Sequence, residues 1–331
     1  MATTDARLLD SAPVRQRPPR GISSVPRTIW QFCRRKPLGA VGGFIVVAAL
    51  FCAFFVDGQI VGSSAPLLAP THFDDQDLKA RNESPSLSHP MGTDNFGRDI
   101  FSRVLYGART AMIVGFTAVL ISASVSLVLG TVSGYFGGWT DTIIQRFIDM
   151  VLAIPAIITV VFVLSAYGSD VPGWWEGLSG DDAENYWKAA VITATIGFLL
   201  AVASVRVIRG VAISIAANQY VDAARTIGAG DMRIVFRHIV PNVLPVVIVL
   251  ASVQVGAALL ASAAVNFLGL GIQDPFPDWG AMLSLSGSQL FYVEPLQAVW
   301  PGLAIALVVY GFNMFGDALR DVLDPRLRGG R

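Results

Sequence analysis

Long apolar runs separated by polar stretches are the dominant pattern of this 331-residue chain. A helix needs about 20 mostly apolar residues to cross a bilayer, and none of the runs shows the period-two alternation of a membrane β-strand. The runs that reach or approach this length are Leu38–Val56, Ala111–Val132, Ile143–Ala166, Ala189–Val205, Val243–Leu270 and Leu296–Phe315. The pattern predicts an all-α polytopic membrane protein with six transmembrane helices.

Composition and the few charges inside the runs support this interpretation. The chain is 53% hydrophobic and 15% charged, whereas soluble domains carry about 25% charged residues. One run contains a carboxylate, Asp149, together with Pro155, where we expect a kink. Because an isolated carboxylate is costly in hydrocarbon, we expect Asp149 to form a structural ion pair with Arg146 or Arg206 rather than a proton relay.

Basic residues alternate with acidic ones from one polar stretch to the next. The first 36 residues hold seven arginines and one lysine but only Asp5 and Asp10, and they lack apolar periodicity, which is typical of a disordered tail. The positive-inside rule then predicts that both ends of the chain are cytoplasmic. Arg206 and Arg209 fit this rule as anchors, or alternatively contact the following loop or a partner subunit.

This orientation divides the chain into five parts. They are a basic cytoplasmic tail (1–36), a first transmembrane helix (37–57), an extracytoplasmic segment (58–108), a core with helices two to six and a cytoplasmic loop at 210–241 (109–318), and a cytoplasmic C-terminal tail (319–331).

The 210–241 loop has the pattern of two short amphipathic helices. We expect Gly228 to end the first helix in a left-handed conformation, Asp231 to cap the second, and Pro241 to end or kink it. The apolar stripe of the first helix is predicted at Ile213, Ala217, Tyr220, Ala224 and Ile227. That of the second is predicted at Met232, Val235, Phe236, Ile239 and Val240.

Helices this short are marginal in water, so each needs a surface to pack against. One stripe can rest on the transmembrane bundle, while the small residues Ala223, Ala224 and Gly228 would let another protein approach the backbone. An ordinary loop lying on lipid headgroups is the alternative on periodicity alone.

The stretch "DAARTIGAGDMRIVFRHIVPN" resembles the EAA loop of permeases in bacterial ABC importers. Asp222-Ala223-Ala224, Gly228 and Pro241 match that motif in register. Aspartate replaces glutamate, His238 stands at an isoleucine position and Val240 at a leucine position. In that family the loop docks into a groove on the ATP-binding subunit. The resemblance implies that the ATPase-coupling residues are Asp222, Ala223, Ala224, Arg225, Gly228, Asp231 and Pro241.

Four further stretches resemble the C-type permease of oligopeptide and dipeptide importers. They are "HPMGTDNFGRDIFSRVLYGART", "GYFGGWTDTIIQRFIDMVLAIPAI", "NFLGLGIQDPFPDWGAML" and "FNMFGDALRDVLDPRLR". The likeness runs in order over roughly residues 37–328, and departs from the family at the basic tail and at the Trp-rich acidic loop Gly168–Lys188.

This resemblance implies the fold of a type I importer permease that forms half of a translocation pathway. The implied partners are a homologous B-type permease in a heterodimer, two ATPase subunits or one fused chain, an extracytoplasmic peptide-binding protein and membrane lipid, with no nucleic acid. Glutathione, nickel or haem are alternative substrates to peptides. Other classes are a self-contained secondary transporter or channel and, least favoured, a membrane-anchored scaffold.

Polar and glycine residues before the second apolar run have the chemistry of a turn followed by a helix start. They are Gly92, Thr93, Asp94, Gly97, Arg98 and Asp99. A purely structural turn is one interpretation. An outer-gate element or a contact with the binding protein is the other.

Catalysis finds no support in the sequence. The three histidines, His72, His89 and His238, do not cluster, and the chain has no HExxH, GxSxG or phosphate-binding GxxxxGK[ST] motif. We therefore expect a non-catalytic subunit without metal or cofactor, with ATP and Mg²⁺ held by partner subunits. The two cysteines, Cys33 and Cys52, are interpreted as ordinary thiols.

Overall fold

A computed structural model describes residues 33–34, 36–57, 66–179, 182–287 and 295–323. Over these ranges the regular structure is helical, apart from one isolated bridge between Thr93 and Asp99. Most of the predicted basic tail and the residues after Leu323 lie outside the described residues. Residues from Leu38 onward form one compact unit, to which the following description applies. The predicted all-α class is confirmed.

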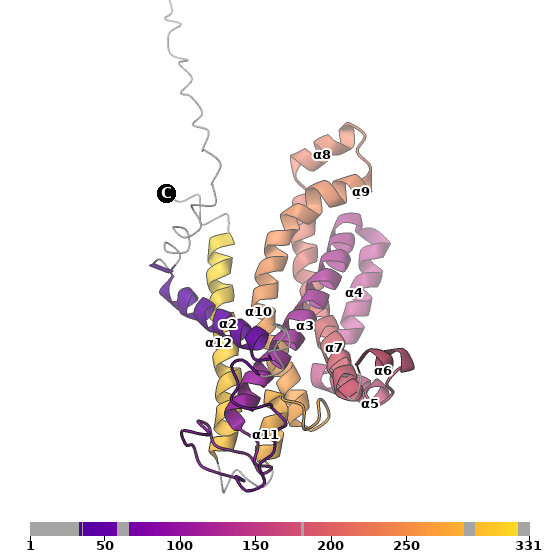
Figure 1. Ribbon diagram of the computed structural model, residues 1–331. Helices are drawn as coiled ribbons and strands as arrows, with labels where there is room; N and C mark the ends of the chain where they lie inside the picture. Colours follow the sequence, from indigo (N-terminus) through magenta and orange to yellow (C-terminus); the bar gives the residue numbers. More distant parts are fainter. Residues whose placement is uncertain (1–32, 35, 58–65, 180–181, 288–294, 324–331) are drawn as a thin grey trace, which may run out of the picture. The chain divides into compact units, whose positions relative to one another are not determined.

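The helices follow one another along the chain, and the longest segment between two of them, residues 56–99, joins α2 to α3 (Figure 1). Their bounds are α2 Pro37–Phe55, α3 Ile100–Phe136, α4 Gly138–Leu152, α5 Ala156–Tyr167, α6 Gly173–Ser179, α7 Ala183–Ala216, α8 Gln219–Thr226, α9 Asp231–Ile234, the π-helix η4 Val235–Ile239, α10 Val240–Phe267, α11 Trp279–Gly287 and α12 Leu296–Leu323.

Among the described residues, five helical spans are long and apolar enough to cross a membrane. They are α2, α3, α7, the continuous run from α9 through α10, and α12. The third predicted crossing, Ile143–Ala166, is broken: α4 and α5 are bent by 85° relative to each other. A proline disfavours helical geometry in the residue before it. Pro155 therefore separates two helices, a larger change than the kink expected there.

Several helices extend beyond the apolar runs that predicted them. α3 begins at Ile100, so the expected boundary between the 58–108 segment and the core falls inside this helix. α7 continues to Ala216, which places the first residues of the 210–241 loop in its last turns. Hydropathy registers the part of a helix that can lie in lipid, whereas caps decide where it ends.

Close packing of α3 on α7 forms the centre of the bundle, and α10 packs against α3, α7 and α12. Glycine makes the α3–α7 approach possible. A Cβ on Gly130 of α3 would lie 2.7 Å from the Ile208 Cβ, and one on Gly197 of α7 would lie 2.6 Å from the Ala118 carbonyl oxygen. The two helices can therefore approach this closely only because positions 130 and 197 are glycine, which has no side chain.

A second apolar cluster lies at the α8–α9 end of the bundle, opposite α11 and the 66–99 segment (Figure 1). Its buried side chains come from α7 through α10: Ile208, Ala212, Val221, Ala224, Ile234, Ile239, Val243 and Val247. This cluster joins the 210–241 loop to the ends of two membrane-spanning helices, so the loop is packed on the bundle.

We predict that Gly197→Ala destabilises the protein, because the new methyl group would collide with the α3 backbone. Overpacking of this kind costs about 1–3 kcal/mol. The matched control is Gly210→Ala on the same helix, where a Cβ meets nothing within 4 Å and alanine gains about 0.5–1 kcal/mol of helix stability. Thermal unfolding in detergent should separate the two variants, and equal unfolding temperatures would contradict the proposed close packing.

Candidate functional site

Helix α8 turns one narrow face toward the bundle and leaves the rest open. Val221 and Ala224 are buried in the apolar cluster at this end, whereas Asp222, Ala223 and Arg225 are exposed. The expected stripe is therefore wrong in detail. Ala224 alone of its five residues is buried, and Val221, which was not part of it, is fully buried in the cluster.

Gly228 ends helix α8 as predicted. Its φ of +84° lies in the left-handed region that favours glycine. The Gly228 N–H donates to the Arg225 carbonyl at 2.9 Å, and the Ala229 N–H donates to the Ala224 carbonyl at 3.0 Å. These two bonds form a Schellman motif, which satisfies carbonyls that the helix end leaves free. Beyond the backbone strain, a side chain at Gly228 would meet nothing within 4 Å.

One expectation for the second half of the loop is wrong, and another is wrong in part. Gly230, not Asp231, is the N-cap of α9, and Asp231 is its first helical residue. The Asp231 carboxylate instead accepts a hydrogen bond of 2.8 Å from the Tyr135 hydroxyl at the end of α3. Of the two outcomes expected at Pro241, a helix end is wrong, because α9 to α10 run on as one span. The turn before Pro241 is π-helical, and in it the Val240 N–H donates to the Val235 carbonyl. The wider turn accommodates a residue without an N–H.

Large apolar side chains remain uncovered on the loop. Ile227 is 86% exposed, and Tyr220, Met232 and Phe236 are exposed as well. All four belong to the two predicted stripes, which were expected to pack inward. Such exposure within 17 residues is typical of a contact surface for another molecule.

Four charged side chains tie α4 to α7 near the same end. Arg209 forms a bidentate pair with Asp141, at 2.6 Å from each of two guanidinium nitrogens, and Arg206 pairs with Asp149 at 2.5 Å. The structural ion pair predicted for Asp149 is confirmed, with Arg206 as the partner. The role of Arg209 was missed, because Asp141 lies 68 residues away along the chain.

The second predicted motif, at the opposite end, forms a buried turn. The carboxylate of Asp94 accepts hydrogen bonds from the Phe96 and Arg98 N–H groups at 2.8 and 2.9 Å. Asp99 caps α3 by accepting from the Ser102 N–H at 2.7 Å. The predicted turn and helix start are therefore present.

Both glycines of this motif have a positive φ, +79° for Gly92 and +77° for Gly97. Added Cβ atoms would lie 2.5 Å from the Glu83 carbonyl oxygen and 1.8 Å from the Asp77 carbonyl oxygen. Thr93 is fully buried and its hydroxyl accepts from the Glu83 N–H at 2.8 Å. The small residues are needed for the fold of the turn.

Asp274, in the α10–α11 connection, joins two buried arginines. Its carboxylate accepts from Arg98 at 2.8 Å and from Arg103 at 2.9 Å, and Arg98 also bonds Asp94 at 2.7 Å. Arg98 is only 1% exposed. Burial by itself lowers the pKa of Arg98, but the two carboxylates raise it above its usual value, so the guanidinium stays charged. Sequence reasoning missed Arg103 and Asp274.

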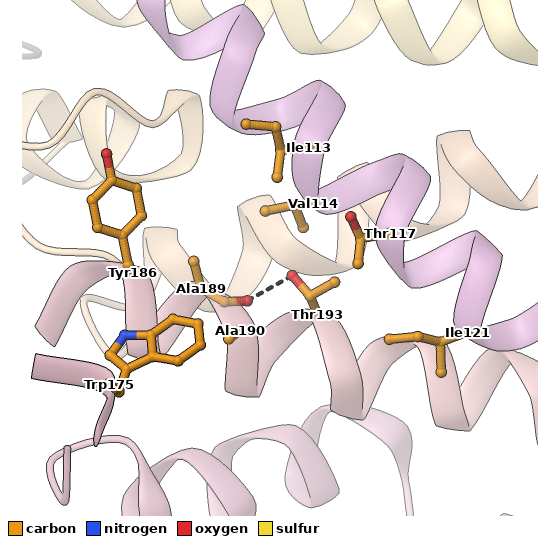
Figure 2. A pocket seen from close by; sticks show the side chains of 9 residues that line it. All are labelled: Ile113, Val114, Thr117, Ile121, Trp175, Tyr186, Ala189, Ala190 and Thr193. Carbon is orange, nitrogen blue, oxygen red and sulfur yellow. Dashed lines mark hydrogen bonds between the residues drawn. The ribbon is translucent and has the colours of Figure 1, made fainter. Parts of the chain in front are cut away.

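An apolar cleft opens between α3 and α7 beside α6 and has a volume of about 720 Å³ (Figure 2). Its lining carries no charged group: Ile113, Val114, Thr117, Ile121, Trp175, Tyr186, Ala189, Ala190 and Thr193. The Thr193 hydroxyl donates to the Ala189 carbonyl at 2.6 Å. A neutral, partly aromatic lining of this kind can bind apolar groups, but it contains no carboxylate, imidazole or amine for acid–base chemistry.

Within the described residues, a bundle of helices long and apolar enough to cross a membrane defines a polytopic membrane protein. The family model for the binding-protein-dependent transport system inner membrane component matches residues 126–329, and the N-terminal transmembrane domain of oligopeptide transport permease C matches residues 25–85. The chain belongs to this family of ABC importer permeases, whose members are non-catalytic transport subunits.

Individual relatives extend over nearly the whole chain. It is 35% identical over 302 residues, 91% of either chain, to the glutathione transport system permease protein GsiD of Pectobacterium atrosepticum. It is 36% identical over 302 residues, 91% of this chain and 90% of the relative, to the dipeptide transport system permease protein DppC of Alkalihalophilus pseudofirmus. The resemblance to C-type permeases is confirmed.

We predict that Asp274→Ala strongly destabilises the protein, since it leaves two buried guanidinium groups without their shared partner. Breaking a buried ion pair in this way costs about 3–5 kcal/mol. Asp170→Ala at an exposed position is the control. Unfolding in detergent should show a large drop for Asp274→Ala alone. If both variants unfold at the wild-type temperature, the ion-pair network has no structural role.

Proposed function

We propose that this chain is the C-type permease of an ATP-driven importer for dipeptides or oligopeptides and forms half of its translocation pathway. Two similar permeases are named for dipeptide and glutathione transport, and glutathione is itself a short peptide. These names support short peptides as the substrate class. Nickel and haem have no comparable support among these relatives.

The observation that carries the proposal is the uncovered 210–241 loop, from here on called the coupling loop. It is packed on the bundle from one side and presents Ala223, Gly228 and Ile227 to its surroundings. Small side chains permit close approach of another backbone, and covering an exposed isoleucine contributes favourably to the free energy of binding a partner. Since the sequence contains no phosphate-binding motif, a partner at this surface would supply the ATP chemistry.

The assembly we propose contains a B-type permease as the second half of the pathway, two ATP-binding subunits or one fused chain, and an extracytoplasmic peptide-binding protein. ATP and Mg²⁺ would be bound by the ATPase. With the coupling loop in the cytoplasm, both termini are cytoplasmic and the 66–99 segment with α11 faces the binding protein. This orientation also agrees with the distribution of lysine and arginine along the chain.

Transport would then proceed by alternating access. Closure of the ATPases on ATP displaces α8 and α9, and the apolar cluster beneath them carries this displacement into α7 and α10, which contribute Ile208, Ala212, Val243 and Val247 to it. The ion pairs from α4 to Arg206 and Arg209 make α4 move with α7. The binding protein delivers peptide at the other end of the bundle.

Reconstitution of the assembly in liposomes tests this function. Uptake of a labelled dipeptide should require ATP, the ATP-binding subunits and the binding protein together, and the chain alone should transport nothing. Uptake by this chain alone, driven by an ion gradient, would instead establish a self-contained secondary transporter.

Gly228 gives a sharper prediction, because its surroundings within the chain are empty. Gly228→Asn should retain uptake, since asparagine tolerates the left-handed conformation. Gly228→Trp should insert normally into the membrane but abolish uptake, because its side chain would separate the coupling loop from the ATPase. Membrane levels and ATP-dependent uptake are measured for both. Full uptake by Gly228→Trp would refute close docking at this surface.

A further inference from the structure

Tyr135, in the last turn of α3, contacts both halves of the coupling loop. Its hydroxyl donates to the Asp231 carboxylate of α9 at 2.8 Å. The Arg225 guanidinium of α8 lies over its ring, 5.5 Å from the centroid, within the range of a cation–π interaction. Arg225 also bonds Asp222 at 3.3 Å, so a polar chain runs from the start of the EAA-like motif to α9 through one tyrosine.

The chain turns sharply just after Tyr135. Gly137 and Gly138 have φ values of +62° and +53°, and a Cβ at either position would meet nothing within 4 Å. These glycines are therefore needed for conformation and not for packing. Beyond them, the Ser133 hydroxyl and Arg209 both bond Asp141, which fixes the start of α4. The connection between α3 and α4, called the α3–α4 corner, thus contains two glycines in the left-handed region and is held by the bonds of Ser133 and Arg209 to Asp141.

We propose that Tyr135 is a positioning residue that transmits displacement of the coupling loop into α3 and the α3–α4 corner. The proposal rests on the proposed function, because it needs an ATPase that moves α8 and α9. It adds a hydrogen-bonded route to α3, whose Ala123, Leu127 and Tyr135 otherwise only pack against the apolar cluster formed by α7 to α10.

Directionality is the reason for assigning this role to Tyr135. Val221 and Ala224 hold α8 through apolar contacts, which have no preferred direction and permit small sliding movements. A hydrogen bond and a cation–π contact fix both distance and orientation. Tyr135, Arg225 and Asp231 are at least partly exposed, so these contacts add little to stability and can break and reform in each cycle.

The test uses the complete transporter in liposomes, with uptake of a labelled dipeptide and ATP hydrolysis measured on the same vesicles. Tyr135→Phe keeps the ring and removes the bond to Asp231. It should lower the peptide transported per ATP about two- to fivefold, as expected for one exposed contact with a charged group, while ATPase subunits still co-purify. Asp231→Ala should have the same effect, and Asp231→Asn, which keeps an acceptor oxygen, should restore most of the ratio.

The double variant Tyr135→Phe/Asp231→Ala separates transmission from general damage. If the two groups act as one link, the double variant transports as much per ATP as either single variant. Tyr310→Phe, an exposed tyrosine on α12, should match the wild type. The proposal is overturned if the losses of the two single variants multiply in the double variant. It is also overturned if Tyr135→Phe transports as much peptide per ATP as the wild type, or if the ATPase no longer co-purifies with that variant. Failure of the wild type itself to transport with ATP would overturn the proposed function together with it.

Discussion

The exclusion of unsatisfied polar backbone from hydrocarbon is the constraint on which this structure depends. It requires the apolar runs to be helical, and the cost of charge in hydrocarbon moves the ion pairs toward the two ends of the bundle. At one end Asp274 gathers Arg98 and Arg103. At the other, Asp141 and Asp149 join α4 to Arg209 and Arg206. Between these ends the helices contact one another through glycine and small side chains, as at Gly197.

The two ends differ in how much of their polar chemistry is enclosed. The network around Arg98 is buried, and its turn requires glycine at Gly92 and Gly97 for steric reasons. This favours a structural role for the 92–99 motif, whose part in gating or in contact with a binding protein remains a prediction. The coupling loop is open, with Ile227 largely exposed. A surface that lacks a cover in the single chain is where a subunit of an assembly is expected to bind.

Local features were predictable from the sequence and distant pairings were not. Gly228 ends α8 and Asp99 begins α3 as expected, because a left-handed turn and an N-cap depend on a few neighbouring residues. Asp274 lies 176 residues from Arg98, and periodicity carries no information about such a contact. Asp231 was assigned to a cap by local rules, but a tertiary partner, Tyr135, takes its carboxylate.

Hydropathy had a related limit. It counts apolar residues without recording direction, so the region that bends by 85° at Pro155 was expected as one crossing. It also could not say which apolar side chains of the coupling loop face inward. Periodicity assigned Tyr220 and Phe236 to buried stripes, but both are exposed in the single chain. A loop that packs on the bundle with one face and binds a partner with the other carries apolar side chains on both faces. The error therefore coincides with the proposed contact surface.

Photo-crosslinking from position 227 tests the central claim most directly. A photoreactive amino acid replaces Ile227 in membranes that contain the whole transporter. The same amino acid at the exposed Leu87, within the 66–99 segment at the opposite end of the bundle, serves as the control. The account predicts a covalent adduct with an ATP-binding subunit from position 227 and none from position 87. An ATPase adduct from position 87, or none from position 227 in transport-competent membranes, would contradict it.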